Sequence, residues 1–323
     1  MQNIKEFMVW ARNDIKSMLP RDLTKNMTIE ENTVIKMNDQ FCYGLTLKRG
    51  DEEAAPTIYM NEYFDRYMNG EPMKQLMAEA CQEYLDAIVN KPDIVTQDLT
   101  FEKIKDNLTI RVMEGKRNLQ FLSNIPYMSM GNGFVAICDI KVVEENSGYW
   151  RTTINHSLME ENHYDKSEMF RAAIENSQEK YPVVMTTMME QLFGKDNRNL
   201  LDTDGVIPEE SKDHMYIIST NEGLLGASAF FYPGVREKIS EKLGEGYYAL
   251  PSSINEILII PESCAPPVKD IADMVYEANR TVVDPKEVLS DNIFHYDRET
   301  KELETIKSDR IRSIESPDYA MRS

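Results

Sequence analysis

The sequence predicts an α+β protein in which mixed or antiparallel sheets pack against helices on one side, with two subdomains. Strand-like runs rich in Thr, Val, Ile and Tyr stand between amphipathic helical stretches. Between residues 220 and 261, two such runs, a short helix and a Pro-Ser-Ser turn follow one another closely. With 323 residues, 41% hydrophobic and 28% charged, the chain can bury a core without disulfides or metals, so we expect no cofactor.

Residues 1–95 are predicted to form an N-terminal α+β subdomain. The opening apolar stripe has helical spacing and is ended by Pro20, and it has neither the pattern of a signal peptide nor that of an anchor. Pro72 suits a helix start, and the polar passage Lys91–Thr100 marks the boundary. The expected elements are a helix over Met1–Leu19, strands over Met27–Lys36, Phe41–Arg49 and Pro56–Met60, and a helix over Pro72–Asn90.

Residues 96–323 are predicted to form a larger α+β domain. Met130–Gly133 indicates a hairpin turn, because Asn and Gly accept positive φ angles. Asp165 and Glu168 form a capping box that begins a helix, which Tyr181 ends. The elements expected in its first part are a helix over Phe101–Lys105 and strands over Leu108–Met113, Tyr127–Met130, Phe134–Glu144 and Tyr149–Asn155.

The last third of the chain alternates between strand and helix patterns. Val183–Phe193 is Met-rich and predicted to be helical, and the polar stretch near 194–213 is predicted to be an exposed loop. We expect strands over His214–Thr220, Ala227–Tyr232, Tyr247–Leu250, Ile257–Ile260, Ile293–Tyr296 and Leu303–Ile306, and helices over Val235–Leu243 and Val268–Asn279.

The formal charge of −19 limits the classes of partner. Residues 161–323 carry 31 acidic and 18 basic side chains, so the excess lies mainly in the second half. This acidity disfavours nucleic-acid binding and allows a protein partner with a basic surface, although solubility alone also explains it. Four widely spaced cysteines and the absence of a long apolar run favour a cytoplasmic protein without a membrane span.

One pattern suggests catalysis as an alternative. Asp139 and Lys141 alternate on a predicted strand, and Glu114 ends another, which resembles the acidic-x-Lys core of metal-dependent nucleases. A metal-dependent hydrolase would use these carboxylates to hold magnesium and the lysine to position water. Polar residues that alternate with apolar ones on a half-exposed strand produce the same sequence pattern without any catalytic role. A cleft that gathers the three residues would favour the enzyme, and their dispersal would favour a binding module.

The remaining patterns predict no metal site. His156, Glu160 and His163 would share a helix face, but a surface helix carries such residues routinely. Asp202 and Asp204 precede Gly205 without the first and last ligands of a calcium loop. The Gly226–Ala229 segment lacks the last glycine of a nucleophile elbow.

Ordered blocks along the chain resemble an uncharacterised bacterial family known as a domain of unknown function. The blocks are Tyr232–Val235, Leu250–Glu256, Met274–Asn279 and Glu287–Asp291, with upstream similarity through Pro56–Tyr59 and Lys103–Arg111. The resemblance covers nearly the whole chain and implies a cytoplasmic bacterial α+β protein with no assigned activity. The resemblance implies a His usually at the position of Asn255 and often at that of Tyr127, so this chain departs from the family pattern at both, and any chemistry of those histidines is not expected here.

These observations predict a non-enzymatic interaction or regulatory module. Polar residues at strand ends are where scaffolds usually display function. The candidate surface is therefore the turn after Pro251 together with the adjoining loop that follows the predicted strand His214–Thr220. Its residues are Asn221, Glu222, Ser252, Ser253, Asn255 and Glu256.

Overall fold

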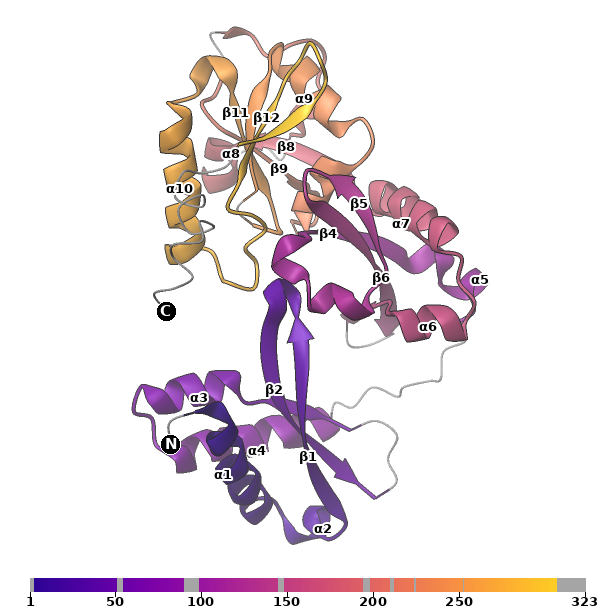
Figure 1. The fold of residues 1–323 in the computed structure, drawn as a ribbon, viewed down its shortest axis with the longest axis vertical. Helices are drawn as coiled ribbons and strands as arrows, with labels where there is room; N and C mark the ends of the chain where they lie inside the picture. Colours follow the sequence, from indigo (N-terminus) through magenta and orange to yellow (C-terminus); the bar gives the residue numbers. More distant parts are fainter. Residues whose placement is uncertain are drawn as a thin grey trace, which may run out of the picture. The chain divides into compact units, whose positions relative to one another are not determined.

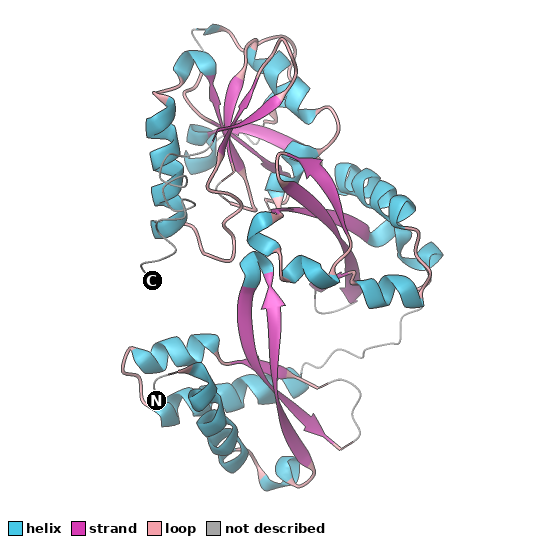
Figure 2. Cartoon of the chain, viewed as in Figure 1, coloured by secondary structure: helices cyan, strands magenta, loops and turns pink. Residues whose placement is uncertain are grey.

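The computed structural model describes residues 3–50, 55–89, 99–144, 148–193, 198–209, 212–223, 225–251 and 253–306; within these ranges, the side chains of 141–144, 148–150 and 191–193 are not described. The chain divides into two compact units, Met1–Gln97 and Asp98–Ser323, and each is described by itself (Figure 1). Helices and antiparallel strands occur in both units (Figure 2), which confirms the α+β class and its antiparallel form.

The first unit is a three-stranded sheet covered by helices. Strands β1 and β2 pair along their whole length, and β3 joins the other edge of β2. Phe7 and Ile15 of α1 pack with Leu45 of β2 and Tyr84 of α4 in one buried core. The elements are α1 (Ile4–Met18), α2 (Arg21–Thr24), β1 (Met27–Lys36), β2 (Gln40–Arg49), β3 (Thr57–Tyr59), α3 (Asn61–Met68) and α4 (Met73–Val89).

The second unit contains two antiparallel sheets. In one, β6 pairs with β4 along one edge and with β5 and β7 along the other, and the second sheet has the order β13-β12-β10-β11-β9-β8. The strands are β4 (Leu108–Glu114), β5 (Tyr127–Gly131), β6 (Phe134–Glu144), β7 (Gly148–Thr153), β8 (Val183–Thr187), β9 (Tyr216–Thr220), β10 (Tyr247–Leu250), β11 (Ile257–Pro261), β12 (Ile293–Tyr296) and β13 (Leu303–Ile306).

The helices of this unit follow local sequence signals. Asp165 begins α7 as expected, because its carboxylate accepts a hydrogen bond from the Glu168 N–H at 2.8 Å. The α-helices are α5 (Phe101–Ile104), α6 (His156–Glu161), α7 (Lys166–Lys180), α8 (Met188–Phe193), α9 (Val235–Leu243) and α10 (Val268–Thr281). The 3₁₀ helices used below are η3 (Lys116–Asn118), η5 (Leu200–Asp202) and η7 (Gly226–Phe231).

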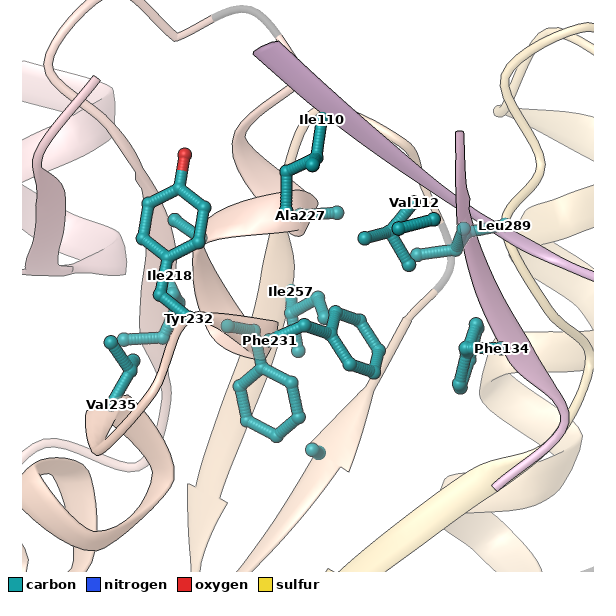
Figure 3. Close-up of a cluster of buried hydrophobic side chains, with 14 of the residues drawn as sticks. Ile110, Val112, Phe134, Ile218, Ala227, Phe231, Tyr232, Val235, Ile257 and Leu289 are labelled. Carbon is teal, nitrogen blue, oxygen red and sulfur yellow. The ribbon is translucent and has the colours of Figure 1, made fainter. Parts of the chain in front are cut away.

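The short helix η7 joins the two sheets through one hydrophobic core. Figure 3 draws Ala227 and Phe231 of η7 together with Val112 of β4 and Ile257 of β11. Leu289, which precedes β12, belongs to the same cluster. Burial of these side chains on η7 therefore holds the end of β4 near the segment that enters β12.

Two buried serines complete the outer edge of β4. The hydroxyl of Ser177 in α7 accepts a hydrogen bond from the Ile110 N–H at 2.9 Å, and that of Ser228 in η7 accepts one from the Val112 N–H at 3.0 Å. An edge strand needs such partners because an unpaired buried N–H is costly. Ser228 therefore helps to hold η7 against the edge of β4.

Helices cover both faces of the six-stranded sheet. Val235 and Ile239 of α9 pack with Ile259 on one face, whereas Ile271 of α10 packs with Ile260 on the other. Neighbouring residues of a strand point to opposite faces, so Ile259 and Ile260 serve two different layers. The expectation of helices on one side therefore holds only in part.

Two element assignments from the sequence are wrong. Val183–Thr187 is strand β8 rather than the start of a helix, because it pairs with β9 and buries Met185. Residues 227–231 are the 3₁₀ helix η7 rather than a strand. Within the polar stretch near 194–213, Leu201 is 5% exposed and belongs to the main core.

Candidate functional site

The turn between β10 and β11 contains most of the predicted binding residues. Ser252 lies outside the described residues. The Ser253 hydroxyl accepts a hydrogen bond from the Asn255 N–H at 3.0 Å, which closes a local turn. The side-chain oxygen of Asn255 accepts from the Leu225 N–H at 3.2 Å, and its carbonyl oxygen accepts from the Ser219 hydroxyl at 2.9 Å. Asn255 therefore fastens the turn to the loop that follows β9.

The predicted loop residues lie at the same end of the sheet. Ile257 pairs with Ile218 in antiparallel register, so the loop leaving β9 and the turn entering β11 emerge side by side. Asn221 and Glu222 are both exposed on that loop. The structure thus brings the described members of the predicted set together.

Glu256 is the one carboxylate in this set that is partly buried. Among the described residues, none donates a hydrogen bond to it and none forms an ion pair with it. Burial raises the pKa of its carboxyl group above the ordinary value. A half-buried acid without a partner is a group that a cation from another molecule could satisfy.

Asp139 is held by neighbours in its own sheet. Its side chain is 1% exposed, and Arg111 donates two hydrogen bonds to it, both at 2.9 Å. The Thr153 hydroxyl donates a third at 2.7 Å. This fork-on-carboxylate geometry is the strong form of an ion pair. The carboxylate is therefore engaged in holding β4, β6 and β7 together.

The structure separates the two carboxylates of the hydrolase alternative. Asp139 lies opposite Thr109, whereas Glu114 lies opposite Phe134, five residues away along β6. At about 3.3 Å per residue, the separation is about 16 Å. An odd number of residues also places the two carboxylates on opposite faces of the sheet. The side chain of Lys141, the third residue of that alternative, lies outside those described.

Glu114 instead enters a polar cluster at the end of β4. Its Oε1 atom accepts hydrogen bonds from the Ser290 hydroxyl at 3.1 Å and from the Asn292 side-chain amide at 3.2 Å. Its carbonyl oxygen accepts from the Asn118 side chain at 2.8 Å. Burial raises the pKa of Glu114, and the nearby Asp291 carboxylate adds to the rise, whereas Arg117 and the hydrogen bonds from Ser290 and Asn292 oppose it.

Asp291 is the charged centre of this cluster. Arg117 of η3 donates to its carboxylate at 3.0 Å, and Arg280 of α10 donates at 3.1 and 3.3 Å. The Asn279 side chain donates at 2.9 Å to the same carboxylate and also to the carbonyl oxygen of Ser290. Burial raises the pKa of Asp291, but these donors and cations outweigh it and leave the pKa lowered. Glu114 and Asp291 are thus shifted in opposite directions.

Three buried polar atoms of the cluster have no hydrogen-bond partner among the described residues. They are Nε of Arg117 and the side-chain oxygens of Asn279 and Asn292. Asn279 is 5% exposed. Buried polar atoms usually bind another protein group or an ordered water molecule. The cluster therefore has one hydrogen-bond donor and two acceptors that the described residues leave unsatisfied.

The other motifs have structural partners. Helix α6 ends at Glu161, and His163 beyond it has a φ of 55°, so His156, Glu160 and His163 do not share one helix face. In the described chain, no group of three His, Cys, Asp or Glu residues could hold a metal ion. At the loop containing Gly205, Lys242 donates to the carbonyl oxygens of Thr203 and Gly205 at 2.9 and 2.8 Å.

Sequence reasoning found Glu114 but missed its partners. Ser290 follows Glu114 by 176 residues, and no local pattern connects the two. Asn279 and Asp291 do fall within the blocks that carry the family resemblance. Membership in those blocks is the sequence feature that could have marked these residues as important. Only the packing of the two sheets shows that they lie beside the end of β4.

The family model extends over both the turn and the cluster, because it matches residues 4–298. The chain belongs to the family of unknown function DUF5688. No curated protein and no solved structure matches the chain. DUF5688 membership therefore confirms the resemblance seen in the sequence and assigns no activity. The described helices of this DUF5688 chain include none with the length and apolarity that crossing a bilayer requires.

Proposed function

We propose that this chain is a non-enzymatic binding module that recognises a basic surface on a protein partner in the cytoplasm. The observation that carries the proposal is the partly buried carboxylate of Glu256, which no described residue satisfies and whose pKa is raised. An arginine or lysine from a partner would supply the missing donor and charge. Exposed Asn221 and Glu222 would form the rim of the contact.

The arrangement of the turn supports binding because the turn is already ordered. Asn255 holds it against the loop after β9 through its side chain and its carbonyl oxygen. A preorganised polar surface loses less conformational entropy when a partner binds. The four cysteines are all free thiols, which suits a reducing cytoplasm.

The hydrolase alternative has weaker geometric support. Glu114 and Asp139 lie on opposite faces and about 16 Å apart by strand geometry, and Asp139 is already bound by Arg111 and Thr153. The dispersal of these groups favours the module over a catalytic set built from them.

The test compares binding of an arginine-rich peptide with that of the same peptide in which citrulline replaces arginine. We expect Glu256→Gln to weaken arginine-peptide binding by about tenfold or more, because it removes one partly desolvated charge pair. Glu175→Gln on the exposed face of α7 is the matched control for net charge. Equal losses in the two variants, or equal binding of the two peptides, would contradict the proposed site.

A further inference from the structure

We propose that Asn199 closes the outer edge of strand β8 against pairing with a second copy of this chain. β8 is the last strand at one end of the six-stranded sheet. A strand in that position presents a row of backbone N–H and C=O groups on which another strand can pair. This inference does not depend on the proposed role of Glu256.

Alternate residues of β8 direct their backbone groups away from β9. At the two ends of the pairing, the carbonyl oxygen of Pro182 accepts from the Asn221 N–H, and the Met188 N–H donates to the carbonyl oxygen of Met215, both at 3.3 Å. The even-numbered residues therefore bond to β9, because inward and outward backbone groups alternate along an antiparallel strand. The residues that direct theirs to the open edge are Val183, Met185 and Thr187.

The side chain of Asn199 occupies this open edge as a neighbouring strand would. Its Nδ2 donates to the carbonyl oxygen of Val183 at 3.0 Å, and its Oδ1 accepts from the Met185 N–H at 2.9 Å. The Glu190 carboxylate accepts from the next outward N–H, that of Thr187, at 3.0 Å. A side-chain amide has the donor and the acceptor of a peptide group, so Asn199 satisfies two outward groups at once.

The same side chain also anchors the loop that carries it. Oδ1 of Asn199 caps η5 by accepting from the Leu201 N–H at 3.2 Å, and Nδ2 donates to the Asp202 carboxylate at 2.9 Å. Leu201 packs into the main core and so holds the loop beside β8. Loss of the Asn199 side chain would therefore open the edge and loosen its cover together.

The composition of β8 explains why its edge needs closing. Its sequence, Val-Val-Met-Thr-Thr, has four β-branched residues and no charge, whereas edge strands are commonly protected by charged side chains. At the other end of the sheet, β13 carries Glu304, and Asn132 donates to its Leu303 carbonyl oxygen at 2.6 Å.

A second copy of β8 is the partner that this edge fits. Antiparallel pairing centred on Met185 would place Val183 of one copy opposite Thr187 of the other. Every outward residue would then meet another outward residue, and no like charges would come together. The same arrangement makes the contact symmetric, as in most dimers of identical chains.

The experiment compares Asn199→Ala with the wild type by sedimentation velocity over a range of protein concentrations. We expect the weight-average sedimentation coefficient of Asn199→Ala to rise with concentration more steeply than that of the wild type. Amide hydrogen exchange locates the contact. At low concentration, exchange at the Met185 N–H should be about fivefold faster than in the wild type, because one hydrogen bond is lost, and it should slow again as the concentration rises.

Two control variants separate strand pairing from local damage. Asn155→Ala removes a comparable bond, from the Leu158 N–H at 2.8 Å at the start of α6, and should associate no more than the wild type. Thr186→Lys in the Asn199→Ala background should restore the wild-type sedimentation, since lysine on an edge strand opposes pairing. Equal association of Asn199→Ala and the wild type, or association that Thr186→Lys does not reverse, would overturn the proposal.

A milder variant keeps the test decisive if Asn199→Ala does not fold. Asp202→Ala changes an exposed residue and removes the bond that orients the Asn199 amide, while the amide itself remains. We expect exchange at Met185 and concentration-dependent association to rise in the same direction as in Asn199→Ala, but less. Wild-type exchange and sedimentation in Asp202→Ala would then overturn the proposal.

Discussion

Asp139 gives the sharpest test of whether the buried charges in β4, β6 and β7 are structural. In Asp139→Ala, the Arg111 guanidinium loses two hydrogen bonds and the Thr153 hydroxyl loses one. Removing one partner of a buried ion pair costs roughly 3–5 kcal/mol. Arg111 keeps its bond to Thr153 at 2.8 Å and is 19% exposed, which places the expected loss near the lower end, about 3 kcal/mol.

Urea unfolding followed by circular dichroism measures this loss directly. For a folding unit of this size, about 3 kcal/mol corresponds to a fall in Tm of roughly 6–12 °C. The matched control is the double variant Arg111→Met/Asp139→Leu, which replaces both charges with apolar groups. A fully replaced buried pair is often neutral in stability, so the double variant should recover most of the loss.

Two results would contradict a stabilising role for the Arg111–Asp139 ion pair. A loss below about 1 kcal/mol in Asp139→Ala with an unchanged m-value would show that the ion pair contributes little. A double variant as unstable as Asp139→Ala would show that the stranded arginine is not the cause. Either result would show that this ion pair does not stabilise β4, β6 and β7 in the way inferred from its hydrogen bonds.

Three other substitutions test separate parts of the second unit. Gly226→Ala should lower the free energy of unfolding in urea by about 1–3 kcal/mol, because its Cβ would lie 2.4 Å from the Asn255 carbonyl oxygen. Gly115→Ala is the control, since its Cβ would meet no atom closer than 3.4 Å, and equal losses in the two variants would contradict the prediction. Asp165→Ala should lower stability by about 1 kcal/mol through loss of the α7 cap, and an unchanged urea midpoint would disprove the cap's contribution. Glu256 has a raised folded-state pKa, so wild-type stability should fall as pH rises from the unfolded pKa through the folded one. Glu256→Gln should make that fall smaller in urea midpoints compared between pH 4 and pH 8, because Glu114, whose pKa is also raised, still contributes to it. An equal fall in both proteins would refute the contribution of Glu256.

The elements that sequence predicted well carry strong local signals. The paired strands β1 and β2 differ from the expected ranges by one residue at most, because alternating β-branched residues and a short connection define them. Asn132 has a φ of 52° in the turn between β5 and β6, as the flanking glycines indicated. Each of these features depends on residues that are close in sequence.

The elements that were wrong depend on distant partners. Val183–Thr187 has the apolar content of either a strand or a helix, and pairing with β9 decides for the strand. The η7 segment also reads as an apolar strand, but Ser228 must reach the Val112 N–H and Phe231 must enter the core. A short apolar run does not contain that information, so tertiary packing decides its conformation.

The candidate site shows the same limit in chemical terms. A carboxylate at the end of a predicted strand identified Glu114 as a residue of interest. Its neighbours suggested a metal site with Asp139, whereas the fold brings it to Ser290 and Asn292. The alternation of side chains along a strand shows that Glu114 and Asp139 face opposite sides once the register of β4 against β6 is known. The sequence does not reveal that register.

The segment from Glu287 to Asn292 contacts the turn through its backbone and Glu114 through its side chains. The Ser290 N–H donates to Pro251, and the Ser290 hydroxyl donates to Glu114. Ser290→Ala therefore removes the side-chain contact with Glu114 while it keeps the backbone bond to the turn. If the Glu114 contact steadies the turn, this substitution must increase exchange at Ser253–Glu256 even though no contact of those residues has been deleted. Because the backbone and the side chain of Ser290 have different partners, the coupling between Glu114 and the turn can be measured without direct damage to the turn.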